Sequence, residues 1–233
     1  MDWNNDSNVD LLVGDTGGNI SLFLNTSSDA MPQLDAGRII MASDGTFDSE
    51  RAAPIVDDWN EDGKKDLIVG RMGGTIEIYL NEGTDALPVF STLSLLQVDG
   101  TDFDIGTRSA PRIYDWNHDG LKDMLIGELY GNIYYLENVG TNAAPVFDSY
   151  EMFLLANGDP LKYDYANNPT GAPRSRLFVT DWNEDGLDDI IVGGANGKLE
   201  LYTSVVPEPV SSTLFILGGA ALGFRHFRKK FKQ

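Results

Sequence analysis

The sequence predicts an all-β protein made of repeated units, each with about four antiparallel strands. Three observations predict it. An acidic loop motif recurs four times, each copy precedes two short apolar runs separated by a glycine-bearing turn, and residues 1–204 show no sustained helical period of apolar side chains. Such repeats are typical of β-propeller blades, whose radial packing protects sheet edges. A β-sandwich could use similar strands, but it would not need the same loop four times.

The acidic loop has the same length in every copy. Its pattern is Asp-Trp-Asn-x-Asp-x-x-x-Asp, and three of the four copies carry glycine at the sixth position. The copies span 2–10, 58–66, 115–123 and 181–189, so the steps between them are nearly equal except for the last, which is longer. The fixed pattern defines four predicted units, at about 1–50, 51–107, 108–165 and 166–204.

Each loop leads into a predicted β-hairpin, because a short apolar run that ends in glycine is followed by a turn and an alternating run. The first runs cover 11–14, 67–70, 124–127 and 190–193, and the second runs cover 20–24, 76–80, 133–136 and 199–202. A Pro-x-hydrophobic step and a further strand-like run then lead to a turn at 44–45, 99–100 or 157–158. A last strand, which begins near an Ala-Pro pair at 53–54, 110–111 or 172–173, enters the next loop.

The loop pattern predicts a calcium site. Oxygen-bearing side chains stand at positions 1, 3, 5 and 9, a backbone carbonyl is available at position 7, and calcium takes six to eight oxygen ligands. We therefore expect about four Ca²⁺ ions, with water completing each shell. The predicted ligands are Asp2, Asn4, Asp6, Asn8 and Asp10; Asp58, Asn60, Asp62, Lys64 and Asp66; Asp115, Asn117, Asp119, Leu121 and Asp123; and Asp181, Asn183, Asp185, Leu187 and Asp189.

Position 6 must turn sharply around the ion, which suits Gly63, Gly120 and Gly186. The first loop has Ser7 there, so we expect its site to be the weakest. An EF-hand does not fit, because position 12 falls within a strand and is never a glutamate. The alternative is an acidic turn held by Asx hydrogen bonds without metal. His118 stands at the solvent-facing position 4, and we assign it no chemistry.

Two aromatic features of the units could serve packing or sugar binding. The tryptophan at position 2 of every loop suits the core or the contact between units, and the alternative is a sugar-stacking platform. An insert at 162–169 lengthens the last step between loops. It is rich in aromatic and amide side chains, so it is either a sugar-contacting loop or a neutral surface loop.

The units resemble FG-GAP/VCBS repeats, the calcium-loop blades of integrin-type β-propellers. The resemblance covers about residues 1–204 and rests on the fourfold motif. It implies that the listed side chains bind calcium and that the propeller serves recognition, adhesion or scaffolding. Such propellers usually have about seven blades, and four units do not readily close that ring. Because Met1 directly precedes the first loop, we expect a fragment or an N-terminally truncated chain.

The C-terminal segment, 205–233, differs from the acidic body. All 36 acids but only 12 of the 17 basic residues lie within 1–208, which gives that part a net charge of −24. The stretch 210–224 carries no charge, and 225–233 carries five basic side chains. Although 210–224 is short for a bilayer span, a basic flank that snorkels and local thinning could compensate. We expect a transmembrane segment, and the alternative is a buried core helix.

The motif at 206–209, an apolar span and a basic end resemble the PEP-CTERM sorting signal of Gram-negative bacteria, with Pro207, Glu208 and Pro209 matching its motif. The resemblance implies export across the inner membrane, recognition and cleavage by an exosortase, and association with extracellular polysaccharide, surface protein or biofilm. That route uses an N-terminal signal peptide, and residues 1–6 do not resemble one. This is a second reason to expect a missing N-terminus.

Composition narrows the function further. The net charge of −19 argues against nucleic acid, and the absence of cysteine excludes thiol chemistry. The first hypothesis is a non-catalytic, calcium-stabilised surface or secreted module that binds glycan or protein or acts as a scaffold. The second is part of a polysaccharide lyase or glycoside hydrolase. We expect no catalytic residues, because every prominent carboxylate cluster repeats with the unit and an active site should not. A purely structural spacer remains a third possibility.

Overall fold

The computed structural model describes residues 1–40, 51–163 and 173–204. Residues 1–203 belong to one compact unit. Every regular element in the described ranges is a β-strand, and every strand pair within the sheets is antiparallel. This confirms the all-β, antiparallel part of the fold prediction.

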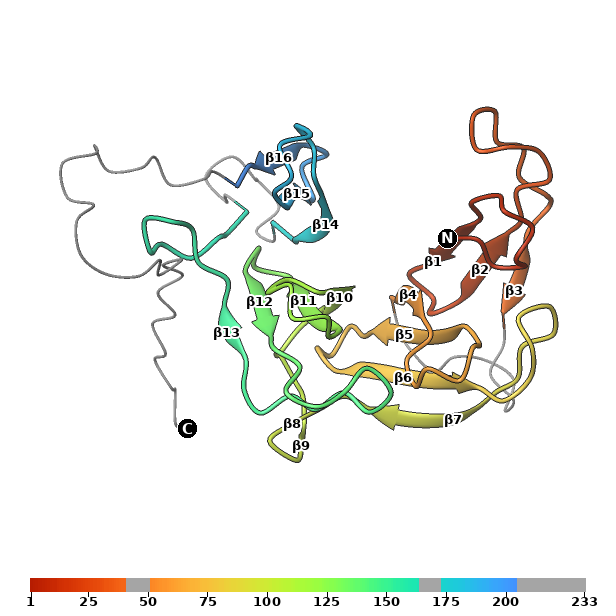
Figure 1. Cartoon of the computed structure of the whole chain (residues 1–233), viewed down its shortest axis with the longest axis horizontal. Coiled ribbons are helices and arrows are strands. Elements are labelled where there is room, and N and C mark those ends of the chain that lie inside the picture. Colours follow the sequence, from red (N-terminus) through yellow and green to blue (C-terminus); the bar gives the residue numbers. More distant parts are fainter. Residues whose placement is uncertain (41–50, 164–172, 205–233) are drawn as a thin grey trace, which may run out of the picture. The chain divides into compact units, whose positions relative to one another are not determined.

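Four sheets follow one another along the chain, and in each the strands neighbour one another in sequence order (Figure 1). The first contains β1 (Leu11–Gly14), β2 (Ile20–Phe23) and β3 (Arg38–Ile40); the second contains β4 (Ala53–Asp57), β5 (Asp66–Gly70), β6 (Ile76–Asn81) and β7 (Phe90–Leu95). The third contains β10 (Ala110–Tyr114), β11 (Asp123–Gly127), β12 (Ile133–Leu136) and β13 (Glu151–Met152), and the fourth contains β14 (Arg176–Thr180), β15 (Asp189–Gly193) and β16 (Leu199–Tyr202).

The predicted number of four strands per unit holds for the second and third sheets, whereas the first and fourth have three strands in the described ranges. A small ribbon of β8 (Gln97–Val98) and β9 (Thr101–Asp102) was not predicted as a separate sheet. Its turn is the predicted Asp99-Gly100 pair, and both residues have positive φ, of 51° and 70°. This is the backbone that a tight two-residue hairpin requires.

Strand register places the acidic loops at equivalent corners. In the second, third and fourth sheets the pair that closes the loop is Asp57 with Asp66, Tyr114 with Asp123, and Thr180 with Asp189. The ninth loop position is therefore also the first residue of β5, β11 and β15. As a result, the second, third and fourth loops join the first two strands of their sheets, whereas the first loop leads into β1, the first strand of its sheet.

Three apolar clusters lie between consecutive sheets. In β5, Leu67 and Val69 belong to the cluster shared with the first sheet, whereas Ile68 belongs to the cluster shared with the third. In β11, Leu125 faces the fourth sheet. Because side chains alternate between the two faces of a strand, an apolar run without alternation buries both faces. Each fully buried aliphatic side chain contributes about 1.5–3 kcal/mol.

The sheets meet at a repeated backbone junction. A Cβ at Gly70 would lie 2.2 Å from the Ser109 carbonyl oxygen, and one at Gly127 would lie 2.4 Å from that of Ser175. The buried Ser109 hydroxyl donates to the Thr75 carbonyl at 2.6 Å and accepts from the Arg71 amide at 3.0 Å. Glycine is therefore required here by close approach, and the serine links two sheets.

The first junction is simpler. A Cβ at Gly14 would lie 2.3 Å from the Ala52 carbonyl oxygen, so the backbones approach as closely as at the other junctions. Alanine stands where the other junctions have serine, and it cannot form the hydroxyl bonds. The backbone junction of the first two sheets therefore lacks the serine hydroxyl bonds of the other junctions.

Candidate metal-binding loops

In all four acidic loops the side chains at positions 1, 3 and 5 turn onto the backbone of their own loop. In the second loop the Asp62 amide donates to Asp58 Oδ1 at 2.9 Å and to Asn60 Oδ1 at 3.1 Å. The Gly63 amide donates to Asp58 Oδ2 at 2.9 Å, and the Lys64 amide donates to Asp62 Oδ1 at 3.0 Å. These are the Asx-type bonds of the alternative interpretation, and they also bring three oxygen-bearing side chains together.

The same set of bonds recurs in the other loops. Asp119, Asp185 and Asp6 each donate their amide to the position-1 carboxylate and the position-3 amide oxygen of their own loop, at 3.0–3.2 Å. The next amide donates to the second oxygen of the position-1 carboxylate, and that of position 7 donates to position 5. One loop structure is therefore built four times.

Two residues of each loop have left-handed backbone. Position 6 has φ of 85°, 87° and 84° at Gly63, Gly120 and Gly186, and Ser7 adopts the same conformation with φ of 71°. A non-glycine residue in this region costs about 1–2 kcal/mol, so the first loop is the strained copy. Position 4 is also left-handed in every loop, with φ of 55–62°, although no residue there is glycine and the sequence did not predict this backbone.

Position 9 has a different environment from positions 1, 3 and 5. Asp66 is fully buried, and its carboxylate accepts from the Trp59 amide at 2.9 Å and from the Asn81 amide at 2.7 Å. Asp123 makes the equivalent bonds to the Trp116 and Asn138 amides. The carboxylate at position 9 thus fastens the start of the loop to the end of the strand that follows its own.

Electrostatics at position 9 reflects this burial. Burial raises the pKa of the Asp66 carboxyl, and the nearby charges of Asp62 and Asp58 raise it further, against the lowering effect of the two backbone bonds. Burial likewise raises the pKa of Asp123. Because negative charges crowd the loop, a bound cation would offset an electrostatic cost that the chain otherwise bears.

Three units also contain a buried asparagine that was not among the predicted site residues. Asn25 lies just beyond the second strand of the first sheet, whereas Asn81 and Asn138 lie at or just beyond the end of the third strand of theirs. All three are buried, and each donates its backbone amide to a position-9 aspartate. Their side-chain oxygens accept two amides of the following turn, as Asn81 does from Gly83 and Val89. The available signal was that each asparagine stands at the same spacing from the position-9 aspartate of its unit.

Neighbouring loops also contact one another through position 8. Lys65 Nζ bonds to Asn5 Oδ1 of the first loop at 2.7 Å, and Lys122 Nζ pairs with Asp57 Oδ1 beside the second loop at 2.8 Å. His118, to which we assigned no chemistry, lies 3.2 Å from Asp188 Oδ2 and is 70% exposed. These polar contacts join consecutive loops.

The residues fit a hard cation in their chemistry, because every candidate ligand atom is oxygen. The side chains at positions 1 and 3 accept from the same amide, that of position 5, and the position-5 carboxylate accepts from the amide of position 7. Nowhere in the described ranges do three or more Asp, Glu or His side chains gather closely enough to hold a metal by themselves. A site would therefore combine two carboxylates, an asparagine oxygen, backbone and water. The position-9 carboxylate could bind the ion only through oxygen lone pairs that do not already accept a backbone hydrogen bond.

The aromatic residues serve mainly in packing. Trp3 is fully buried and packs against Phe90, Trp59 against Phe147, and Trp116 against Phe153. This confirms the packing role for three of the four loop tryptophans. Trp182 is 61% exposed, so the packing interpretation is wrong for the fourth loop, whose sheet has no following sheet in the described residues.

Tyr163 belongs to the insert that could contact sugar, and the structure places it elsewhere. Its ring is fully buried against Gly194, and its hydroxyl donates to Asn196 Oδ1 at 2.5 Å. It is therefore part of the core beside the fourth sheet. The remainder of the insert, from 164 onwards, lies outside the described residues.

Comparison with known proteins identifies one stretch of the chain. The family model of the FG-GAP-like repeat matches residues 58–126, which run from the second acidic loop through the third loop and into β11. No curated protein matches the sequence. Residues 58–126, in the second and third units, are thus similar to an FG-GAP-like repeat, in agreement with the resemblance noted in the sequence.

The C-terminal sorting motif and the expected span at 210–224 lie outside the described residues. In the portions of the chain that the structure does describe, no helix is long and apolar enough to cross a membrane.

Proposed function

We propose that this chain is an exported calcium-binding module of propeller-type blades, which serves as a non-catalytic adhesion, recognition or scaffold element. The observation that carries the proposal is one acidic loop built four times with the same internal bonds, in a chain with an FG-GAP-like repeat at 58–126. In the proposed assembly each sheet is one blade, and each loop holds one Ca²⁺ at the corner between two strands.

Bound calcium would explain why each loop gathers several carboxylates. Each loop collects two exposed or half-buried carboxylates and one amide oxygen on a short stretch of backbone, and a third carboxylate lies buried beside them. Repulsion among them disfavours the folded loop, and a divalent ion would relieve it. Since binding favours only the folded state, thermal stability should rise as calcium exceeds its dissociation constant.

The test is calcium binding by the full chain and by matched variants. We expect about four ions per chain by calorimetry and a thermal midpoint that falls in EDTA and returns with calcium. Replacing Asp62 and Asp119 with alanine should remove two ions. The control Glu61→Asn removes a charge from the same loop, at a position with left-handed backbone that asparagine tolerates. This variant should bind as many calcium ions as the unmodified chain. Unchanged stoichiometry in the double variant would contradict the proposed sites.

We further propose that residues 206–233 direct export and sorting. Pro207, Glu208 and Pro209, the apolar segment and the basic end would be recognised by an exosortase at the inner membrane of a Gram-negative bacterium. The body would then reach the cell surface or the extracellular matrix, where polysaccharide or a surface protein would be its partner. Deleting 206–233 should release the protein from the membrane fraction. Continued membrane retention of the deleted form would contradict the sorting role.

A further inference from the structure

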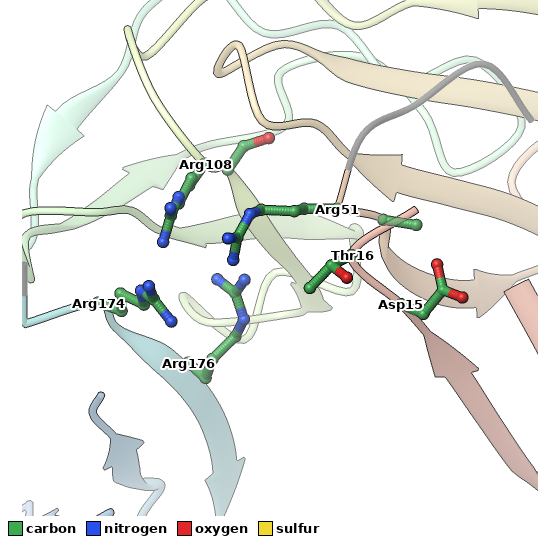
Figure 2. A pocket seen from close by; sticks show the side chains of 9 residues that line it. Asp15, Thr16, Arg51, Arg108, Arg174 and Arg176 are labelled. Carbon is green, nitrogen blue, oxygen red and sulfur yellow. The ribbon is translucent and has the colours of Figure 1, made fainter. Parts of the chain in front are cut away.

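Four arginines gather in one cavity away from the acidic loops. The cavity has a volume of about 330 Å³ and is lined by Arg51, Arg108, Arg174 and Arg176, together with Asp15, Thr16 and neighbouring backbone. Figure 2 shows the four guanidinium groups pointing toward one another, with the Asp15 carboxylate to their side. The arginines come from three different units, so the cluster exists only when the sheets are assembled.

Three of these arginines occupy the same place in their units. Arg51, Arg108 and Arg174 stand in the turn that precedes the first strand of the second, third and fourth sheets, and their φ values are 56°, 51° and 55°. Backbone bonds hold this turn, because the Arg108 and Arg174 amides donate to the Met72 and Leu129 carbonyls. Glycine and asparagine adopt left-handed backbone more readily than other residues do. Arginine in all three places indicates that its side chain, rather than its backbone preference, is used.

The fourth arginine does not belong to the repeat pattern. Arg176 begins β14 in a position that Ala53 and Ala110 occupy in the two preceding sheets. This extra cation is added at the one place where three others already meet. A structural turn does not require it, because the two preceding sheets form with alanine.

Among the residues that line the cavity, Asp15 alone carries a carboxylate, and it forms no ion pair with the arginines. Within the described ranges, none of the four guanidinium groups forms an ion pair, whereas Arg71 nearby pairs with Glu77. Asp15 binds within its own turn, where its carboxylate accepts the Gly17 and Asn19 amides. Within the described part of the chain, the buried Nε of Arg174 has no hydrogen-bond acceptor.

The positive charges of the clustered arginines repel one another. Burial lowers the pKa of Arg108, and the charges of Arg174 and Arg51 lower it further. Burial and the charges of Arg174 and Arg108 lower the pKa of Arg176, although its side chain keeps substantial exposure to solvent. Residues 1–208 have a net charge of −24, so carboxylates were available as partners, and the fold nevertheless places these four cations together.

We propose that this cavity binds a small dianionic oxyanion of the phosphate or sulfate type. Guanidinium groups match such ions because they offer pairs of donors in a planar fork to several oxygen atoms at once. The acidic surroundings disfavour a long polyanion, so the bound group is either a free ion or a single phosphate on an otherwise neutral molecule such as a sugar. The site is independent of calcium, because none of its residues belongs to an acidic loop.

The experiment uses the full chain and measures binding by calorimetry and thermal stability at constant ionic strength. Inorganic phosphate, sodium sulfate and glucose 6-phosphate are the probes, and sodium chloride is the reference. We expect saturable binding of one dianion and a thermal midpoint above that in chloride. Tighter binding of glucose 6-phosphate than of inorganic phosphate would identify a carried phosphate, and equal or weaker binding would identify the free ion; both support the site.

Two variants test the assignment, and one serves as a control. Arg176→Ala restores the residue of the other sheets, and Arg108→Asn keeps a residue that tolerates positive φ; each should weaken binding about tenfold or more. Arg38→Asn removes an equal charge from β3 outside the cavity and should bind as the parent does. Without the anion, Arg108→Asn should raise the thermal midpoint at low salt, because repulsion falls.

Three outcomes would overturn the proposal. They are equal midpoints in phosphate, sulfate and chloride; parental affinity in Arg176→Ala; and a lowered midpoint of anion-free Arg108→Asn, which would show that the arginines stabilise the turn. Calcium stoichiometry is measured on the same samples. Four ions without dianion binding would refute the arginine site alone, and dianion binding without calcium would refute the loop sites alone.

Discussion

The buried carboxylate at position 9 should stabilise the fold even when no calcium is present. In Asp66→Ala the Trp59 and Asn81 amides lose their acceptor, from distances of 2.9 and 2.7 Å. Hydrogen bonds to a charged group contribute about 1.5–3 kcal/mol each. The cost of burying the carboxylate, seen in the raised pKa of Asp66, offsets part of that sum. We expect the free energy of unfolding to fall by about 3 kcal/mol, or about 6–12 °C in the thermal midpoint.

Urea unfolding in EDTA, followed by tryptophan fluorescence, measures this loss without interference from metal. The exposed Asp62 is the matched comparison, since Asp62→Ala removes the same group from the same loop and should cost about 0.5–1 kcal/mol in EDTA. In calcium both variants should lose binding energy as well. If the two variants were equally stable in EDTA and differed only in calcium, Asp66 would act purely as a ligand and the reasoning from its backbone bonds would be wrong.

Three further predictions concern junctions, cores and titration. Ser109→Ala should lower the free energy of unfolding by about 2 kcal/mol, since it removes two buried hydrogen bonds between sheets; a loss below about 0.5 kcal/mol in urea unfolding would refute that. Trp3→Ala should cost about 3–5 kcal/mol and the exposed Trp182→Ala about 0.5 kcal/mol, and equal losses would contradict the packing assigned to them. Burial and the bond to Asp188 raise the pKa of Tyr114 to about 12 from 10.0, so the unfolded phenol ionises first and the stability that Tyr114 contributes is lost between those two pH values. Tyr114→Phe should flatten the alkaline limb of the stability curve, and an unchanged limb would count against the assignment.

Most of the fold that was predictable from the sequence was predicted from local residue patterns. The run 67–70 and its counterparts identified strands because their apolar character, closing glycine and following turn all lie close together in the chain. The closing glycines were identified only as the last residues of these runs. Their actual constraint at Gly70 is the carbonyl of Ser109, which lies far along the chain and enters only when two sheets pack.

The candidate site was predictable in part for the same reason. Positions 1, 3 and 5 bond to amides within their own loop, so spacing alone indicated that their oxygens converge. Asp66 bonds to the amide of Asn81 at the far end of the next strand, so its structural role depends on the pairing of β5 with β6. The arginine cluster joins residues of three units and could not be read from any single copy.

The junction between sheets bears on how such a chain can change in length. Each internal unit carries both kinds of surface that form a junction. A glycine such as Gly70 ends the second strand of a sheet and meets the next unit, and a turn such as that at Ser109 precedes the first strand of a sheet and meets the previous unit. A unit can therefore be duplicated or deleted as a whole, and the new neighbours meet through surfaces that already match. Gene duplication can lengthen the array without inventing a contact, while substitutions such as Ala52 in place of serine adjust how firmly one neighbour holds the next.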